Sequence, residues 1–97
     1  MENNIITSLA NPEIKFISSL KKNTNRKENR KTLVEGCREN KLLIGSGRAI
    51  DSLYICKEII QDKEGKKLID SFVEQGVRIV EVSKKPFMHI SYRDKPD

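Results

Sequence analysis

The chain has 97 residues and a formal net charge of +5, with 36% apolar and 34% charged residues; this allows one soluble domain with a single core and argues against intrinsic disorder. Its two cysteines are widely spaced and it has one histidine, a pattern that argues against a structural metal site and is typical of a reducing compartment. Signal-peptide features and segments of membrane-spanning length are absent from the sequence, so we expect a cytoplasmic protein.

The first predicted element is an amphipathic helix over residues 12–22. Asn11 can cap free backbone N–H groups, and Pro12 suits the first helical position. Glu13 favours the positive end of the helix dipole. Apolar residues then recur at helical spacing, at Ile14, Ile17 and Leu20, with Phe16 beside them. We expect this face, Phe16 included, to belong to the core.

A dense block of positive charge follows, which we call the basic segment, residues 21–31. It contains six basic residues and one acid, a net +5, whereas residues 49–97 carry nine basic and nine acidic residues and sum to zero. Asn23-Thr24-Asn25 breaks the helical pattern, and we expect a polar, mobile loop over residues 23–31. Such a segment concentrates positive potential where a polyanion would meet it. The alternative is a solvated linker that has no partner.

Next, Leu33-Val34 predicts a short strand that ends at Gly36. Residues 37–44 predict a helix that stops at a Gly-Ser-Gly sequence. The candidates for burial on this helix are Leu42, Leu43 and Ile44.

The second half of the chain alternates strands and helices. Residues 50–56 form an apolar run typical of a central strand, and the polar residues 61–66, with Gly65, indicate a connection. Leu68, Ile69, Phe72 and Val73 then mark a helix of about ten residues that Gly76 closes. Residues 77–82 predict the third strand, and Ser83 begins a short helix with Phe87 and Ile90. The alternation predicts an α/β fold, a three-layer α/β/α sandwich with a mainly parallel sheet.

Catalytic chemistry has little support in these residues. Nucleophilic catalysis needs a base beside the nucleophile, and nothing pairs His89 with either cysteine. Phosphate-binding and dinucleotide-binding glycine patterns are absent. We therefore predict no catalytic, cofactor-binding or metal-binding residue in this chain.

Anion binding explains the stretch around Gly36 better. A glycine between a strand and a helix lets backbone approach a ligand, and the helix N-terminus presents unpaired N–H groups to an anion such as phosphate. Arg38 lies in that first turn, while Arg26, Arg30 and Lys31 approach from the preceding loop. The alternative is that Glu35 pairs with Arg38 or Arg26 to brace the turn, and both can hold together.

Several segments match one known pattern, in its order and spacing, over essentially the whole chain. They are residues 6–8, 11–15 (NPEIK), Leu20, the basic segment, residues 33–39 (LVEGCRE), Gly47, the 77–83 strand, Phe87 and residues 90–91. Together they resemble the amino-terminal substrate-binding domain of the SpoU/TrmH family of RNA ribose 2′-O-methyltransferases. Asn40 and Leu43 depart from the pattern, because the family usually has an apolar and a small residue there.

The resemblance implies a fold like that of the ribosomal proteins that bind kink-turn RNA. It also implies that residues 1–92 hold structured RNA, ribosomal or transfer, for a separate carboxy-terminal domain that binds S-adenosylmethionine and usually dimerises. Residues 93–97 would then begin the linker to that domain, and this chain alone would not be catalytic. The alternatives are a free-standing kink-turn-type RNA-binding protein and an interaction or dimerisation module.

The predicted RNA-binding residues combine the positions matched by the resemblance with the charge of the basic segment. They are Lys15, Arg26, Lys27, Arg30, Lys31, Glu35, Gly36 and Arg38. The implied role of the matched positions is to position RNA or to support the turn at Gly36.

Overall fold

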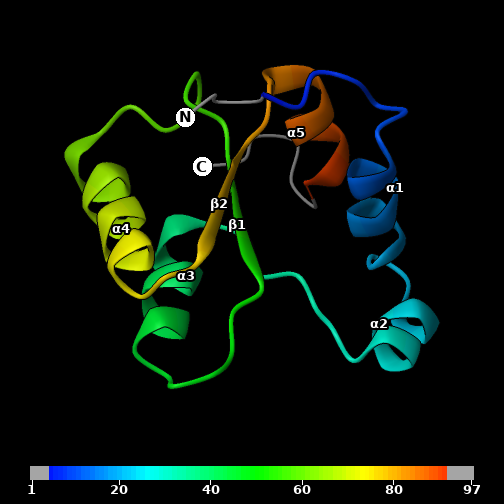
Figure 1. The fold of residues 1–97 in the computed structure, drawn as a ribbon, viewed down its shortest axis with the longest axis horizontal. Helices are drawn as coiled ribbons and strands as arrows, with labels where there is room; N and C mark the ends of the chain where they lie inside the picture. Colours follow the sequence, from blue (N-terminus) through cyan, green and yellow to red (C-terminus); the bar gives the residue numbers. More distant parts are fainter. Residues whose placement is uncertain (1–4, 92–97) are drawn as a thin grey trace.

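The computed structural model describes residues 5–91, which fold into three layers (Figure 1). The elements in chain order are α1 (Pro12–Ser19), α2 (Asn23–Asn29), α3 (Cys37–Ile44), β1 (Ser52–Ile55), α4 (Lys63–Glu74), β2 (Arg78–Glu81) and α5 (Lys84–Ile90). The two strands lie in the middle, with α3 and α4 on one side and α1 and α5 on the other. This arrangement confirms the predicted α/β class.

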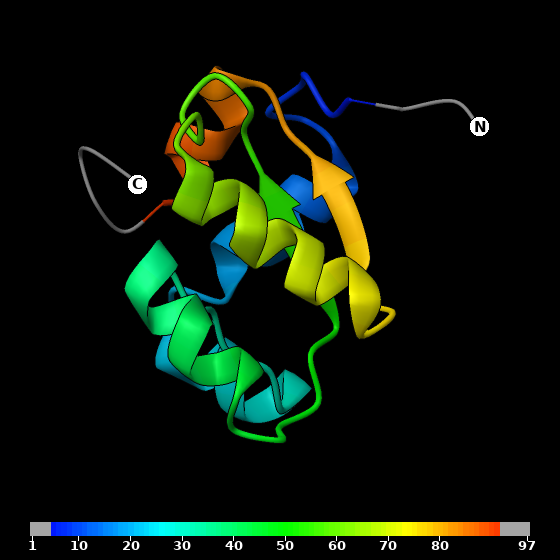
Figure 2. The same ribbon diagram turned by 90° about the vertical axis from the view of Figure 1, so that its left-hand side faces the viewer.

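The sheet is parallel, and its two strands are shorter than predicted, four residues each. β1 and β2 pair in register from Ser52 opposite Arg78 to Ile55 opposite Glu81. Helix α4 makes the crossover between them and lies across the sheet (Figure 2). Ile6 extends the pairing through an isolated parallel bridge to Val82. The sheet therefore ties the start of the described chain to its last strand.

The prediction of a strand at Leu33-Val34 is wrong, because these residues pair with no strand in the described part of the chain. The Val34 carbonyl instead accepts a hydrogen bond from the Asn40 side chain, at 3.3 Å. Asn40 thus provides a partner that a neighbouring strand would otherwise supply.

The core lies between the sheet and the layer of α1 and α5. Its buried cluster consists of Ile14, Ile17, Cys56, Val80, Val82, Phe87 and Ile90. This confirms the predicted apolar stripe of α1. Phe16, in contrast, is 39% exposed, because two helical positions place it about 200° around the helix from Ile14.

The basic segment is helical, and the expectation of a loop there is wrong. Helix α1 ends at Ser19, and α2 begins at Asn23. Two side chains of α2 turn back onto the carbonyls at the end of α1. Asn25 Nδ2 donates to the Ser19 carbonyl at 2.9 Å, and Arg26 donates to two further carbonyls. These bonds satisfy backbone acceptors that a helix end leaves open.

Helix α3 has the predicted bounds, whereas its burial differs. Leu42 is 73% exposed, and Leu43 and Ile44 are half-buried. The reason is that α3 packs mainly against α4 (Figure 2), which covers one side of it. The prediction that all three residues are buried is therefore wrong for Leu42.

Helix α4 begins earlier than predicted, at Lys63, so Gly65 belongs to a helix rather than to a connection. The Asp62 carboxylate caps the helix by accepting from the Gly65 N–H at 2.9 Å. A Cβ at Gly65 would lie 2.4 Å from Ile60 Cγ2, so the glycine serves close packing. Helix α5 follows Ser83 as predicted. Among residues 5–91, no helix has the length and apolar character that crossing a membrane requires.

Candidate nucleic-acid interface

Cationic side chains gather around the end of α2. A shallow cavity of about 260 Å³, which we call the basic hollow, is lined by Arg26, Lys27, Arg30, Lys31 and Thr32. Four of the predicted RNA-binding residues therefore share one surface. Arg26 and Lys27 lie in a helix rather than in the expected loop, Arg30 is its cap, and Lys31 follows the cap. Clustered cations of this kind raise the local concentration of a polyanion.

Within the hollow, Arg26 has an internal role. Its Nη1 donates to the carbonyls of Leu20 and Lys21, at 2.8 Å each, and its side chain is half-buried. A guanidinium bound to two carbonyls at the end of α1 fixes the angle at which α2 leaves that helix. Arg26 thus positions the neighbouring cations.

Lys27 and Arg30 are exposed, and both line the basic hollow. Arg30 caps α2 in the left-handed conformation, with φ 54° and ψ 40°. Both cations lie at the carboxy-terminal end of α2, where the helix dipole favours positive charge.

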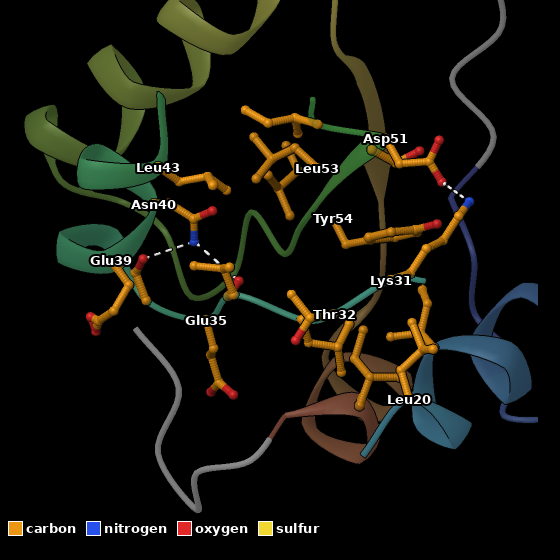
Figure 3. Close-up of a pocket in the computed structure, with 18 of the residues that line it drawn as sticks. Leu20, Lys31, Thr32, Glu35, Glu39, Asn40, Leu43, Asp51, Leu53 and Tyr54 are labelled. Carbon is orange, nitrogen blue, oxygen red and sulfur yellow. Dashed lines mark hydrogen bonds and ion pairs between the residues drawn. The ribbon is translucent and has the colours of Figure 1, made fainter. Parts of the chain in front are cut away.

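Lys31 is held by a carboxylate that directly precedes β1. Its Nζ lies 2.6 Å from Asp51 Oδ2, and both side chains are largely exposed (Figure 3). The hydrogen bond and the positive charge of Lys31 lower the pKa of Asp51. Of the cations in the hollow, Lys31 is thus paired with an acid from another part of the chain.

The predicted glycine turn is present. Gly36 has φ 98° and ψ 150° and is the N-cap of α3, a backbone conformation that essentially only glycine adopts. Asn40 braces the turn, since its Nδ2 donates to the Gly36 carbonyl at 2.8 Å (Figure 3). Glu35 accepts a hydrogen bond from the Ser91 hydroxyl, so it ties the turn to the end of α5.

The remaining predicted residues flank this arrangement. Lys15 on α1 and Arg38 in the first turn of α3 are both exposed, and neither lines the basic hollow or the larger cavity beside it. The structure therefore brings together four predicted residues, and it leaves Lys15 and Arg38 outside the cluster.

The larger cavity, which we call the apolar groove, has no counterpart among the sequence predictions. It has a volume of about 830 Å³ and extends from α1 and the 30–36 segment to α3, α4 and β1. Its apolar wall includes the exposed side chains of Phe16, Val34 and Leu42. Arg30 and Lys31 line both cavities, so the groove opens next to the basic hollow.

A second feature that the sequence does not predict is a polar network that joins α1 to both strands. Arg78 binds the Glu13 carboxylate through two nitrogens, at 2.6 and 3.2 Å, and the Tyr54 hydroxyl donates to the same carboxylate. The bond to Arg78 lowers the pKa of Glu13, whereas burial and the bond to Glu13 raise the pKa of Tyr54 to about 12. A helix acid such as Glu13 carries no sequence signal for partners so distant.

Comparison with known proteins identifies related chains. The family model of the MRM3-like substrate binding domain matches residues 11–97. An RNA 2′-O ribose methyltransferase structure is 27% identical with a TM-score of 0.79, and the alignment covers 96% of this chain and 34% of that one. An rRNA methyltransferase from Sinorhizobium meliloti is 26% identical with a TM-score of 0.76, covering 97% and 34%. A structure of AdoMet-bound rRNA methyltransferase from the same organism gives 26% and 0.75, covering 97% and 33%.

No curated protein matches the chain. The chain spans about a third of the length of the methyltransferase structures it resembles. Since the family match extends over nearly the whole sequence, the resemblance drawn from the sequence motifs is confirmed. The chain belongs to the family of MRM3-like substrate binding domains.

Proposed function

We propose that this domain holds structured RNA for an S-adenosylmethionine-dependent RNA 2′-O-ribose methyltransferase. The observation that carries the proposal is the basic hollow, where cations from α2, its cap and the residue after the cap meet on a domain of this family. Both Sinorhizobium meliloti structures are of rRNA methyltransferase, so ribosomal RNA is the first substrate to test and transfer RNA the second.

The rest of the proposal concerns the whole enzyme. A separate catalytic domain binds the methyl donor and the ribose that is modified. The parent protein forms a homodimer through that domain, in the cytoplasm. Residues 1–92 form the RNA-holding domain, and residues 93–97, which lie outside the described residues, begin the linker. The chain by itself binds RNA without modifying it.

In this proposal the predicted residues have different roles. Lys27, Arg30 and Lys31 contact phosphates from the basic hollow, and Arg26 positions them. Lys15 and Arg38 add outer contacts, whereas Gly36 and Glu35 shape the turn beside the groove. These roles are supported by exposure and charge, since phosphate contacts are made by exposed Arg and Lys side chains.

The test is titration of the chain with a ribosomal RNA hairpin, a transfer RNA and a duplex DNA at several concentrations of salt. If about four phosphates are engaged, the logarithm of the affinity falls against the logarithm of the salt concentration with a slope near −3. The Arg30→Ala/Lys31→Ala variant should flatten this slope by about one to two units, because one or two phosphate contacts are lost.

The matched control is Lys66→Ala/Lys67→Ala, which removes the same charge from exposed positions of α4, on the other side of the sheet from α2. We expect this control to leave the slope unchanged. An equal effect of both variants would remove the basic hollow from the binding surface. A chain that dimerises with concentration and binds no RNA would instead be an interaction module.

A further inference from the structure

The cations of the basic hollow differ in the partners that the structure gives them. Arg26 is bound to backbone carbonyls, and Lys31 is bound to Asp51. The side chains of Lys27 and Arg30 are exposed and make no hydrogen bond or ion pair among the described residues. A phosphate in the hollow would therefore meet one cation bound to carbonyls, one bound to a carboxylate, and two that make no such bond among the described residues.

The Lys31–Asp51 pair links the end of α2 to the start of β1. Lys31 follows the cap of α2, and Asp51 directly precedes β1, twenty residues later. The Asp51 side chain is 75% exposed, so its carboxylate faces solvent beside the ammonium of Lys31 (Figure 3). A phosphate that binds Lys31 must approach this carboxylate or displace it.

We propose that Asp51 is a built-in counter-charge of the basic hollow, which an RNA phosphate must displace from Lys31. This inference rests on the proposed function, and it assigns to Asp51 a role in setting the affinity for RNA. Lys27 and Arg30 make the first phosphate contacts, and the ammonium of Lys31 exchanges Asp51 for phosphate. Repulsive elements of this kind reduce binding to partners that cannot supply the full set of contacts.

A purely structural role explains the pair less well. Exposed ion pairs contribute little to folding, because water and salt screen them and long side chains lose entropy when they are held. Because the pair is weak, phosphate can replace Asp51 at Lys31. Breaking such a pair lowers the affinity for RNA by up to about fivefold.

The test uses the Asp51→Asn variant, titrated with the ribosomal RNA hairpin at low and near-physiological salt. We expect the variant to bind RNA about two- to fivefold more tightly at low salt. We also expect this gain to shrink at near-physiological salt, because salt screens the Lys31–Asp51 pair that the variant removes.

Two further variants separate the pair from the overall charge. Asp70→Asn removes the same charge from an exposed position on α4, on the other side of the sheet from α2, and at near-physiological salt it should change the affinity little. In a Lys31→Ala background, Asp51→Asn should lose its gain, because the ammonium that it releases is absent.

The outcomes distinguish this inference from the proposed function. Wild-type chain that shows no salt-sensitive RNA binding refutes both. If the wild type binds and Asp51→Asn binds equally or more weakly, only the inference is overturned; weaker binding would mean that Asp51 orients Lys31 for RNA. A gain that persists without Lys31 also overturns it, since the carboxylate would then act on the RNA directly.

Discussion

Arg26 is the residue for which sequence and structure lead to different experiments. The sequence predicts a phosphate ligand, whereas the structure shows a guanidinium that donates two hydrogen bonds of 2.8 Å to the carbonyls of Leu20 and Lys21. Replacing Arg26 by Ala removes both bonds and weakens the attachment of α2 to the end of α1, where Asn25 still donates to the Ser19 carbonyl. The variant should therefore lose folding stability as well as charge.

The magnitude follows from the two bonds. A hydrogen bond from a charged donor contributes roughly 1.5 to 3 kcal/mol when it is well shielded, and a neutral one about 1 kcal/mol. Because the Arg26 side chain is half-buried, water replaces part of what is lost, and we expect a total of about 1–2 kcal/mol. For a domain of this size that loss lowers the Tm by roughly 4–16 °C.

The assay is thermal unfolding followed by circular dichroism, with two comparison variants. Lys27→Ala removes the same charge from the next position, which is exposed, and should change stability by less than about 0.5 kcal/mol. Arg26→Lys keeps the charge, and its ammonium can donate to two carbonyls from one nitrogen, as Nη1 does here, so it should retain more stability than Arg26→Ala. Equal stability of Arg26→Ala and Lys27→Ala would refute the bracing role.

Two further predictions concern the turn at Gly36 and the network around Glu13. Gly36→Ala should cost about 1–3 kcal/mol in urea unfolding, because φ is 98° there; Gly45→Ala, at φ −87°, should be nearly neutral, and equal costs would contradict this reasoning. The pKa of Glu13 is lowered in the folded state, mainly by Arg78, so its contribution to stability is present above the ordinary Glu pKa and is lost as the pH falls through the lowered value. Wild-type Tm should thus fall more steeply in acid than that of Glu13→Gln; parallel Tm curves for the two chains would argue against the network.

Local signals in the sequence are sufficient to determine several elements. Asn11 caps α1 as predicted, with its Oδ1 accepting from the Glu13 N–H at 2.8 Å. Helix α3 begins after Gly36 and ends before Gly45, at the predicted residues. Caps and glycines act on backbone within one turn, so their effect is visible in a few consecutive residues.

Elements that depend on distant partners do not follow from local signals. The polar residues at the start of α2 are typical of a helix break. A helix nevertheless forms there, because Asn25 and Arg26 can then donate to the carbonyls at the end of α1. Leu33-Val34 has strand propensity but no neighbouring strand within the described residues, and Asn40 donates to the Val34 carbonyl. Propensity decides such segments only when tertiary contacts do not compete with it.

The candidate site divides in the same way. The sequence by itself determined that the positive charge is concentrated in residues 21–31 and that a glycine turn follows, because composition and backbone freedom are properties of the residues themselves. Only the tertiary structure decided which cations remain available, since it engages Arg26 with carbonyls and Lys31 with Asp51. The physical reason is that a cation is engaged only when folding places an acceptor within hydrogen-bonding distance of it. For Lys31 that acceptor, Asp51, lies twenty residues away along the chain.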